Sequence, residues 1–324
     1  MFAVVLVGGF GTRLRPLTDD IPKPMLPVLH RPMILGLVDR LAEAGVTDVV
    51  LALGFRPEPF ADAFVDDRHG DVRVHYAVEP EPLDTGGAIA FAARWAGIDD
   101  TFVVANGDII TDLDISFLIA EHHRLGPQAT IHLTPVDDPS AFGVVEMGDE
   151  GVVQRFVEKP QPGETESNLI NAGTYVMEPG VLDLIEHGER VSIERDTFPK
   201  LVDGGRLAGV STLDYWIDTG RPDQFLQANL DLIRGVRGVA PGGVSPAAHV
   251  SNDAIVIDSV ISAGVVVSAG TTIVDSVLLP RARVDAGADV RGSIVAGHVA
   301  AAAVVDGCLL YTSPSPRDNI AHGV

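Results

Sequence analysis

A glycine-rich stretch carrying an arginine, followed closely by a lysine, comes directly after the first apolar run of the chain. Residues 8–18 read GGFGTRLRPLT, and PKPMLP follows at 22–27. Glycines let backbone amides approach an anion closely, and Arg13 and Lys23 add fixed positive charge. The spacing is GGxG with no GKS or GKT, so it matches neither a P-loop nor the GxGxxG dinucleotide fingerprint. The stretch predicts a phosphate-binding loop of another kind.

Two aspartates at the ends of hydrophobic runs are candidate metal ligands. Asp108 follows TFVVANG and Asp218 follows DYWI. Mg²⁺ prefers oxygen ligands and commonly takes one or two carboxylates together with substrate phosphates and water. For Asp108 a helix cap or an Asx-turn is the alternative. Asp112 and Asp114 are interpreted as helix-capping residues, and the adjacent His122 and His123 as the polar face of a helix.

The elements that must position these residues form an α/β pattern. From residue 2 to about 110, short β-branched runs alternate with helical patterns, which predicts a mainly parallel sheet covered by helices on both faces. Residues 128–178 carry denser strand signals and predict an antiparallel extension, so the central sheet is expected to be mixed. Ligands of such sheets bind at the carboxyl ends of the strands. The glycine loop, the proline-rich loop after 72–78 and Asn106-Gly107-Asp108 all fall there.

A second architecture begins after a glycine-rich linker at 237–247, so the catalytic domain is predicted to span 1–236. The triplets at 259–261, 276–278 and 293–295 are spaced 17 residues apart, and aliphatic residues recur about every six residues. Both periods predict a short left-handed β-helix of hexapeptide repeats over 248–308. Residues 309–324 lack the period and contain two Ser-Pro steps, so they are interpreted as an irregular tail and a candidate non-native end.

Bulk composition restricts the partners. The 324 residues carry a formal charge of −22 and are 46% hydrophobic, which predicts a globular protein that binds neither nucleic acid nor an anionic membrane surface. The single cysteine, Cys308, excludes an internal disulfide framework. The apolar start ends at Gly8-Gly9 after six residues, too short for a signal peptide or a membrane span. A cytoplasmic location is therefore expected.

The longer string changes the interpretation of the glycine loop, because GGFGTRLRPLT with PKPMLP closely resembles the signature of the sugar-1-phosphate nucleotidylyltransferases. The resemblance continues, in the family's order, through these segments: NGD at 106–108, FGVV at 142–145, VEKP at 157–160, INAGTYV at 170–176, ERDTFPKLV at 194–202 and YWIDTG at 215–220. It implies a Rossmann-like nucleotidyltransferase domain, Mg²⁺ dependence, and transfer from a nucleoside triphosphate to a sugar 1-phosphate without a covalent enzyme intermediate.

The resemblance also assigns roles by position. Arg13 would hold the β and γ phosphates, Lys23 would lie near the α-phosphate, and Asp108 and Asp218 would meet at the metal. The catalytic set is thus Arg13, Lys23, Asp108 and Asp218. The nucleotide-binding set is Leu6, Gly8, Gly9, Gly11, Thr12, Arg13, Glu79, Thr85, Gly86, Asn106 and Gly107. The sugar-phosphate set is Gly143, Glu158, Lys159, Asn171 and Gly173. An exposed Glu–Lys surface pair is the alternative for Glu158 and Lys159.

The family recognises the base in the segment EPEPLDTGGA at 79–88. One carboxylate can accept both N1–H and the 2-amino group of guanine, so Glu79 favours GTP, although Glu81 competes for this role. Asp84 stands where the guanylyl pattern has glycine. GTP with mannose 1-phosphate is ranked first, and dTTP or UTP with glucose 1-phosphate second.

Proteins of other classes remain as alternatives. A non-catalytic sensor of NDP-sugars could use the same fold, but the presence of all four catalytic candidates argues against it. Trp216 is interpreted as a core or wall residue. The repeat is too short for the acyltransferase activity of some relatives, and it is interpreted as a surface for homo-oligomerisation or regulation.

Overall fold

The computed structural model describes residues 1–9, 11–54, 57–238 and 240–311. The chain divides into two compact units. One, called the sheet unit, consists of residues 1–9 and 34–216. The other, called the β-helix unit, consists of residues 10–33 and 217–324. Of its last residues, 312–324 lie outside the described part of the chain, and with them most of the predicted irregular tail.

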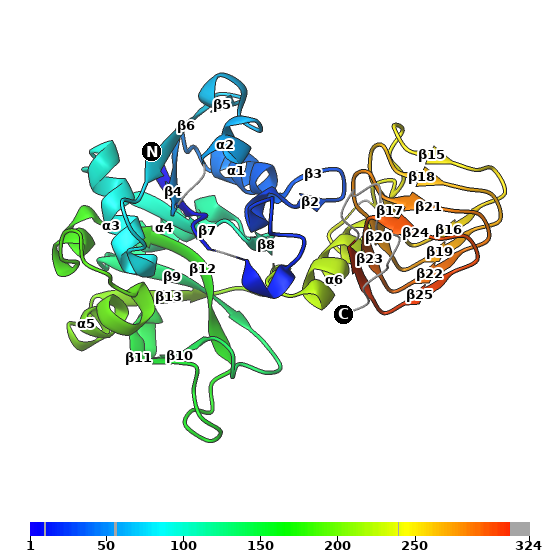
Figure 1. Ribbon diagram of the computed structural model, residues 1–324. Helices are drawn as coiled ribbons and strands as arrows, with labels where there is room; N and C mark the ends of the chain where they lie inside the picture. Colours follow the sequence, from blue (N-terminus) through cyan, green and yellow to red (C-terminus); the bar gives the residue numbers. More distant parts are fainter. Residues whose placement is uncertain (10, 55–56, 239, 312–324) are drawn as a thin grey trace. The chain divides into compact units, whose positions relative to one another are not determined.

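A ten-stranded mixed sheet forms the centre of the sheet unit (Figure 1). Its main path runs β11-β10-β12-β7-β1-β4-β6-β5, and β9 pairs with β12 and β13. Strands β7, β1, β4 and β6 are mutually parallel, whereas β12 runs antiparallel to β7 and β9. The strands are β1 (Phe2–Leu6), β4 (Asp48–Leu53), β5 (Arg68–His69), β6 (Val72–Val78), β7 (Phe102–Asn106), β9 (Ala129–Pro135), β10 (Gly143–Met147), β11 (Val153–Glu158), β12 (Leu169–Met177) and β13 (Leu207–Ser211).

Helices pack on this sheet because their apolar residues recur at helical spacing. Helix α3 packs on β1, β4 and β6, and α4 packs on β9, β12 and β13. All six residues of β4 are buried, as expected for a parallel strand covered on both faces. The α-helices are α1 (Met33–Glu43), α2 (Glu58–Ala61), α3 (Asp84–Ala96), α4 (Ile115–Leu125) and α5 (Phe198–Asp203). The shorter helical turns are the 3-10 helices η3 (Val65–Asp67), η4 (Asp149–Gly151) and η5 (Pro179–Leu184) and the π-helical turn η6 (Ile193–Thr197). Two short strands, β8 (Ile109–Thr111) and β14 (Trp216–Asp218), lie outside the main sheet.

The β-helix unit stacks three parallel sheets whose strands lie 17 residues apart over most of their length. Val260 pairs with Val277, and Val277 with Ile294, as the serine triplets predicted. The sheets are β15 (His249–Val250), β18 (Val266–Val267), β21 (Arg283–Val284) and β24 (His298–Val299); β16 (Ile255–Ile257), β19 (Thr272–Val274), β22 (Asp289–Arg291) and β25 (Val304–Asp306); and β17 (Val260–Ile261), β20 (Val277–Leu278), β23 (Ile294–Ala296) and β26 (Leu309–Tyr311). The predicted fold class, a mixed α/β sheet domain followed by a hexapeptide β-helix, is confirmed.

Smaller elements complete the β-helix unit. Helix α6 (Pro222–Ile233) packs against β2 and β17, and its end is joined to the β-helix by Arg234, which pairs with Asp258 and Asp275. The remaining elements are the 3-10 helices η1 (Thr12–Leu14) and η2 (Lys23–Met25) and the strands β2 (Pro27–Val28) and β3 (Arg31–Pro32).

A ladder of buried serines connects successive coils of the β-helix. Ser259 Oγ accepts the N–H of Ser276 at 3.1 Å, and Ser276 Oγ accepts the N–H of Ser293 at 3.1 Å. Each hydroxyl also donates to the carbonyl two residues earlier in its own coil. The serine of each triplet therefore satisfies the backbone of the next coil.

Replacing Ser276 by Ala is expected to lower the free energy of unfolding by about 1–3 kcal/mol, because the buried Ser293 N–H loses its acceptor. Urea denaturation measures the change. Ser251→Ala is the matched control, since the Ser251 hydroxyl donates to the side chain of Asp253 in an exposed hydrogen bond. Equal losses in the two variants would contradict the role of the ladder.

A buried aspartate in the sheet unit makes stability depend on pH. Asp48 is 3% exposed and accepts hydrogen bonds from Arg73, His75 and Thr47. Burial raises the pKa of Asp48, but these hydrogen bonds outweigh it and lower the pKa to about 2.

Because the folded pKa lies below the ordinary value, Asp48 stabilises the fold above about pH 4 and loses this contribution as the pH falls toward 2. Asp48→Asn is expected to cost about 1–2 kcal/mol at pH 7 and progressively less below pH 4. Urea denaturation of both proteins at pH 7, 4 and 3 measures the difference, and a constant gap would contradict the assignment.

Two sequence interpretations concerning α4 need correction. His122 is 1% exposed and bonds to Thr130 and Glu178, so it belongs to a buried polar cluster and not to a polar helix face. Asp114 caps α4 as predicted, accepting from Phe117 N, whereas Asp112 pairs with Arg40 of α1. Within the described residues no helix is long and apolar enough to cross a membrane.

Candidate active site

The strand order reverses at β1, whose neighbours are β7 and β4, and such a switch point favours ligand binding at the carboxyl ends of the strands. Gly8 follows β1 there. A Cβ at Gly8 would lie 3.1 Å from the backbone nitrogen of Gly54, so a side chain at residue 8 would push the two chain segments apart. Leu6, Gly8 and Gly9 thus lie at the expected edge.

Asn106-Gly107-Asp108 lies beside this segment. Leu6 pairs with Asn106, and Gly107 N donates to the carbonyl of Leu6 at 2.9 Å. A Cβ at Gly107 would lie 2.8 Å from Val7 Cγ1. The tight packing explains why residue 107 is a glycine. Asp108 therefore follows the end of β7, next to the end of β1.

The loop after β6 holds the predicted base-binding residues. Glu79 is 8% exposed, its N–H donates to Leu53 O, and its carboxylate accepts the N–H of Leu83 at 2.9 Å. Burial raises the pKa of Glu79, partly opposed by that hydrogen bond. The side chain of Glu81 is exposed. The two candidate glutamates therefore differ sharply in environment.

Thr85 and Gly86 begin α3 and are bonded within the protein. Thr85 Oγ1 donates to Glu194 at 2.7 Å and accepts from Ile193 N at 2.9 Å. Gly86 N donates to Val191 O at 2.8 Å. Residues of the segment 189–196, for which the sequence predicted no role, thus hold the start of α3. The charged residues at the start of ERDTFPKLV, which overlaps this segment, were the signal available in the sequence.

The predicted sugar-phosphate residues gather on β10, β11 and β12. Gly143 pairs with Glu158, and a Cβ on Gly143 would lie 2.5 Å from Phe156 Cζ and 3.0 Å from Glu158 Oε2. Lys159 follows, two-thirds exposed, with its Nζ 3.5 Å from Glu158 Oε1. Glu158 and Lys159 therefore form an ion pair, and because the lysine is exposed, solvent screening keeps their attraction weak.

Asn171 and Gly173 form a β-bulge in β12. The register with β9 shifts between Asn171 and Tyr175, and Gly173 has a left-handed φ of 77°. Asn171 accepts from Gly173 N and donates to Tyr175 Oη. Trp216 donates to the carbonyl of Ala172 at 2.9 Å, consistent with its interpretation as a core or wall residue.

The β-helix unit carries the other predicted residues, namely Gly11, Thr12, Arg13, Lys23 and Asp218. Gly11 has φ 57°, and a Cβ there would lie 2.9 Å from Thr18 Cγ2, so a glycine is required. Thr18 Oγ1 donates to Gly11 O at 2.8 Å, a closing bond that the sequence did not predict. Arg13 follows on η1 with an exposed side chain.

Lys23 and Asp218 lie together although 195 residues separate them. Lys23 is 6% exposed, and its Nζ lies 3.2 Å from Asp218 Oδ1. The same oxygen accepts the N–H of Gly220 at 2.8 Å. This contact fixes the side chain of Lys23 beside Asp218.

The segment that follows Lys23 is fixed by an asparagine that the sequence analysis missed. Asn229 of α6 is fully buried and accepts the N–H of Leu29 at 2.7 Å. Leu29 has a left-handed φ of 59° in the turn between β2 and β3, a conformation that leucine seldom adopts. The signal in the sequence was a polar residue four positions after Phe225, among the apolar positions of an amphipathic helix.

No cluster of three or more His, Cys, Asp or Glu side chains that could hold a metal by themselves occurs in residues 1–9, 11–54, 57–238 and 240–311. Asp108 follows β7, and Asp218 is the last residue of β14. A site with few protein carboxylates fits Mg²⁺, which keeps waters and binds substrate phosphates, and does not fit a metal caged entirely by protein.

The chain matches a family of nucleotidyl transferases. The family model described as "Nucleotidyl transferase" matches residues 2–235, and a model described as "GlmU-like, C-terminal hexapeptide" matches residues 243–311. The chain belongs to the nucleotidyl transferase family and is an enzyme of that kind.

Similar proteins share most of the chain. "Mannose-1-phosphate guanylyltransferase" of Mycobacterium tuberculosis is 39% identical over 298 residues, covering 88% of this chain and 81% of the relative. "Mannose-1-phosphate guanyltransferase 2" of Candida glabrata is 40% identical over 260 residues, covering 79% and 71%. Among solved structures, HddC from Yersinia pseudotuberculosis complexed with GMP-PN is 31% identical with a TM-score of 0.60, covering 70% of this chain and 97% of that one.

Proposed function

We propose that the protein transfers GMP from GTP to mannose 1-phosphate, giving GDP-mannose and pyrophosphate. The observation that carries this proposal is that curated relatives about 40% identical over more than two-thirds of both chains bear the name of this enzyme. The GMP-PN complex of a structural neighbour supports a guanine nucleotide as ligand.

In this reaction an oxygen of mannose 1-phosphate attacks the α-phosphorus of GTP, an O–P bond forms, and the bond to the β-phosphate breaks. Negative charge increases on the departing pyrophosphate, so fixed cations and accurate positioning supply most of the catalysis. We assign Arg13 to the β and γ phosphates and Lys23 to the α-phosphate. The exposed Arg13 can reach a ligand, and the buried ammonium of Lys23 is held ready by Asp218.

Mg²⁺ is the proposed cofactor, with Asp108 and Asp218 as its protein ligands. When bound, it would neutralise phosphate charge and polarise the α-phosphate. The protein contributes one carboxylate from the end of β7 and one from the end of β14.

The remaining residues are proposed to bind the two organic groups. Gly143, Glu158, Lys159, Asn171 and Gly173 are assigned to the sugar phosphate, with Lys159 as the cation and Glu158 as the hydroxyl acceptor. The loop 79–86 is assigned to guanine. Glu79 is the first choice for the base carboxylate, and Glu81 the alternative because it is exposed.

The test is pyrophosphate release with Mg²⁺ across GTP, dTTP, UTP, ATP and CTP against mannose, glucose and N-acetylglucosamine 1-phosphates. Asp108→Ala is the inactive control, and Glu79→Gln and Glu81→Gln are a matched pair for the base. Activity is expected with GTP and mannose 1-phosphate, abolished in Asp108→Ala and lowered more by one glutamine variant than by the other.

Other outcomes separate the alternatives. Preference for dTTP or UTP with glucose 1-phosphate would retain the enzyme class and overturn the base and sugar. A folded protein that binds GDP-mannose but is inactive with every pair would indicate a sensor.

We also propose that the β-helix mediates homo-oligomerisation. The sheet of β16, β19, β22 and β25 exposes Ile255, Ile257 and Val304 by half or more, which is unusual for aliphatic side chains of one sheet. Light scattering of the full chain is expected to show an oligomer that Ile255→Lys with Val304→Lys dissociates. A monomer would contradict the proposal.

A further inference from the structure

Asp84 is in a backbone conformation that residues other than glycine seldom adopt. It is the first residue of α3 and has a left-handed φ of 61°, which suits glycine and, among other residues, chiefly Asn and Asp. Its own Oδ1 accepts the N–H of Thr85 at 2.8 Å. The sequence pattern had glycine at this position, and the left-handed φ explains why glycine fits there.

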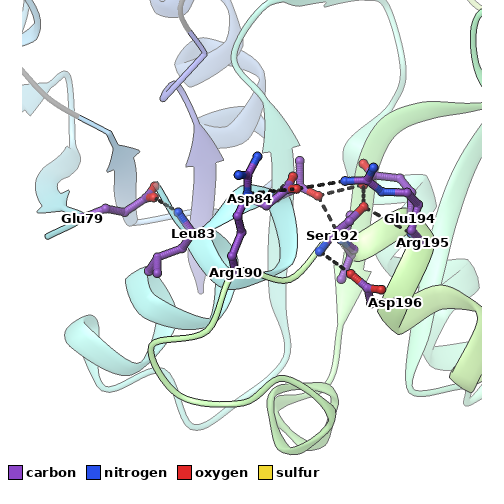
Figure 2. A network of polar contacts seen from close by, with 10 residues as sticks. Glu79, Leu83, Asp84, Arg190, Ser192, Glu194, Arg195 and Asp196 are labelled. Carbon is purple, nitrogen blue, oxygen red and sulfur yellow. Dashed lines mark hydrogen bonds and ion pairs between the residues drawn. The ribbon is translucent and has the colours of Figure 1, made fainter. Parts of the chain in front are cut away.

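The carboxylate of Asp84 supplies an interaction that glycine could not. Its Oδ2 lies 3.0 Å from Arg195 Nη2 and 3.8 Å from Arg190 Nε (Figure 2). Asp84 is one-fifth exposed and the two arginines are mostly exposed. The pairs lie at the surface, so they contribute little to global stability and act on the local position of the loop.

Backbone bonds beside this ion pair allow little freedom between the two segments. Gly86 N and Gly87 N both donate to Val191 O, and Val191 N donates to Leu83 O. A Cβ on Gly87 would lie 2.7 Å from Glu189 O, so the segments approach at backbone distance. The start of α3 is thereby fastened to the segment 189–196.

That segment is itself braced by a side-chain network. Glu194 accepts from both Thr85 Oγ1 and Ser192 Oγ, and Asp196 accepts from Ser192 N (Figure 2). Arg195 is therefore presented to Asp84 by a turn whose polar groups are already bonded.

The loop tip lies between two anchors. On one side Glu79 bonds to Leu53 and to Leu83; on the other Asp84 and Thr85 bond to the segment 189–196. The exposed residues 80–82 stand between them. The tip's position is thus set in part by side chains remote from it in sequence.

Resting on the proposed assignment of loop 79–86 to the base, we propose that Asp84 and Arg195 are positioning residues for the nucleotide. Their ion pair holds the loop 79–83 in the form that binds guanine, without either side chain contacting the nucleotide. In this chain the Asp84–Arg195 ion pair thus takes the place of the glycine in the guanylyl sequence pattern.

The proposal is tested by measuring KM and kcat separately in three variants: Asp84→Asn, Arg195→Met and the double variant. Each single change is expected to raise KM for GTP about two- to fivefold, the range of an exposed ion pair, with kcat and KM for mannose 1-phosphate within about twofold. The double variant is expected to be no worse than the poorer single variant, because both remove one interaction. Arg124→Met, which breaks an exposed pair with Glu121 on α4, is the control and should leave KM unchanged.

Asp84→Gly separates the carboxylate from the backbone conformation, since glycine adopts the left-handed φ freely. It is expected to match Asp84→Asn in KM while keeping the wild-type melting temperature. A wild-type KM in Asp84→Gly or in Arg195→Met, additive losses in the double variant, or equal losses in kcat would each overturn the proposal.

Failure of the proposed function is recognised separately. If the wild-type enzyme prefers another triphosphate, the same variants are compared with that one. If it is inactive with all pairs, calorimetric Kd values for GTP replace KM, and unchanged Kd values in the variants would overturn the positioning role on its own.

Discussion

Replacing Lys23 by Met is expected to lower kcat/KM by about 10²–10³-fold, the usual effect of removing one preorganised charge from a transition state. Lys23 is 6% exposed and its ammonium lies 3.2 Å from Asp218, so its position is fixed before substrate binds. Methionine keeps most of the side-chain volume, and the loss is therefore expected to be one of charge. Steady-state pyrophosphate release with GTP and mannose 1-phosphate measures it.

Two further variants separate catalysis from folding. Lys200→Met is the control, since Lys200 is exposed and donates to the carbonyl of Leu184. The activity of this variant should be unchanged. Lys23→Arg keeps the charge in a larger planar group and is expected to recover only part of the activity. If Lys23→Met retained activity within about threefold while folded, Lys23 would not be a phosphate-binding residue.

The periodic parts of the fold could be predicted because each repeat imposes the same local geometry. A 17-residue period places Ser259, Ser276 and Ser293 one above another, and the hydroxyl–amide ladder follows. Likewise, the apolar runs before the glycine loop and before Asn106-Gly107-Asp108 predicted strands, which the structure has as β1 and β7. These inferences need only neighbours along the chain or a fixed repeat.

Contacts between remote segments could not be predicted in this way. His122 is buried because Glu178, 56 residues away, and Thr130 supply its polar partners. Strand β13 was missed because its sequence, LAGVS, is short and contains a glycine. The glycine packs closely there, because a Cβ at residue 209 would lie 2.6 Å from Met147 Sδ and would displace that side chain.

The candidate site shows the same division. Motif positions such as Gly11 and Gly143 carry local reasons for their residue type, namely a left-handed φ and contact with Phe156. The residues that hold the motifs in place, including Asn229 and Arg195, act across 200 and 111 residues of sequence. A single sequence shows the motif residues, but it does not show which remote residues hold them in position.

Gly173→Ala is expected to lower the free energy of unfolding by about 3 kcal/mol. Alanine at φ 77° costs about 1–2 kcal/mol, and the added Cβ would lie 2.5 Å from Ile109 Cδ1 and 2.6 Å from Asn106 Nδ2, an overpacking that costs about as much again. Because the bulge also sets Asn171, KM for the sugar phosphate is expected to rise. Urea denaturation and steady-state kinetics measure the two effects.

Gly36→Ala is the matched control with the opposite expected sign. Gly36 lies in α1 with an exposed position and no atom within 4 Å of its added Cβ, so alanine is expected to stabilise the helix by about 0.5–1 kcal/mol. The same chemical change thus separates backbone conformation and crowding from the mere addition of a methyl group. A Gly173→Ala enzyme as stable as wild type would mean that the bulge can relax without cost, and the left-handed turn would then not be what positions Asn171.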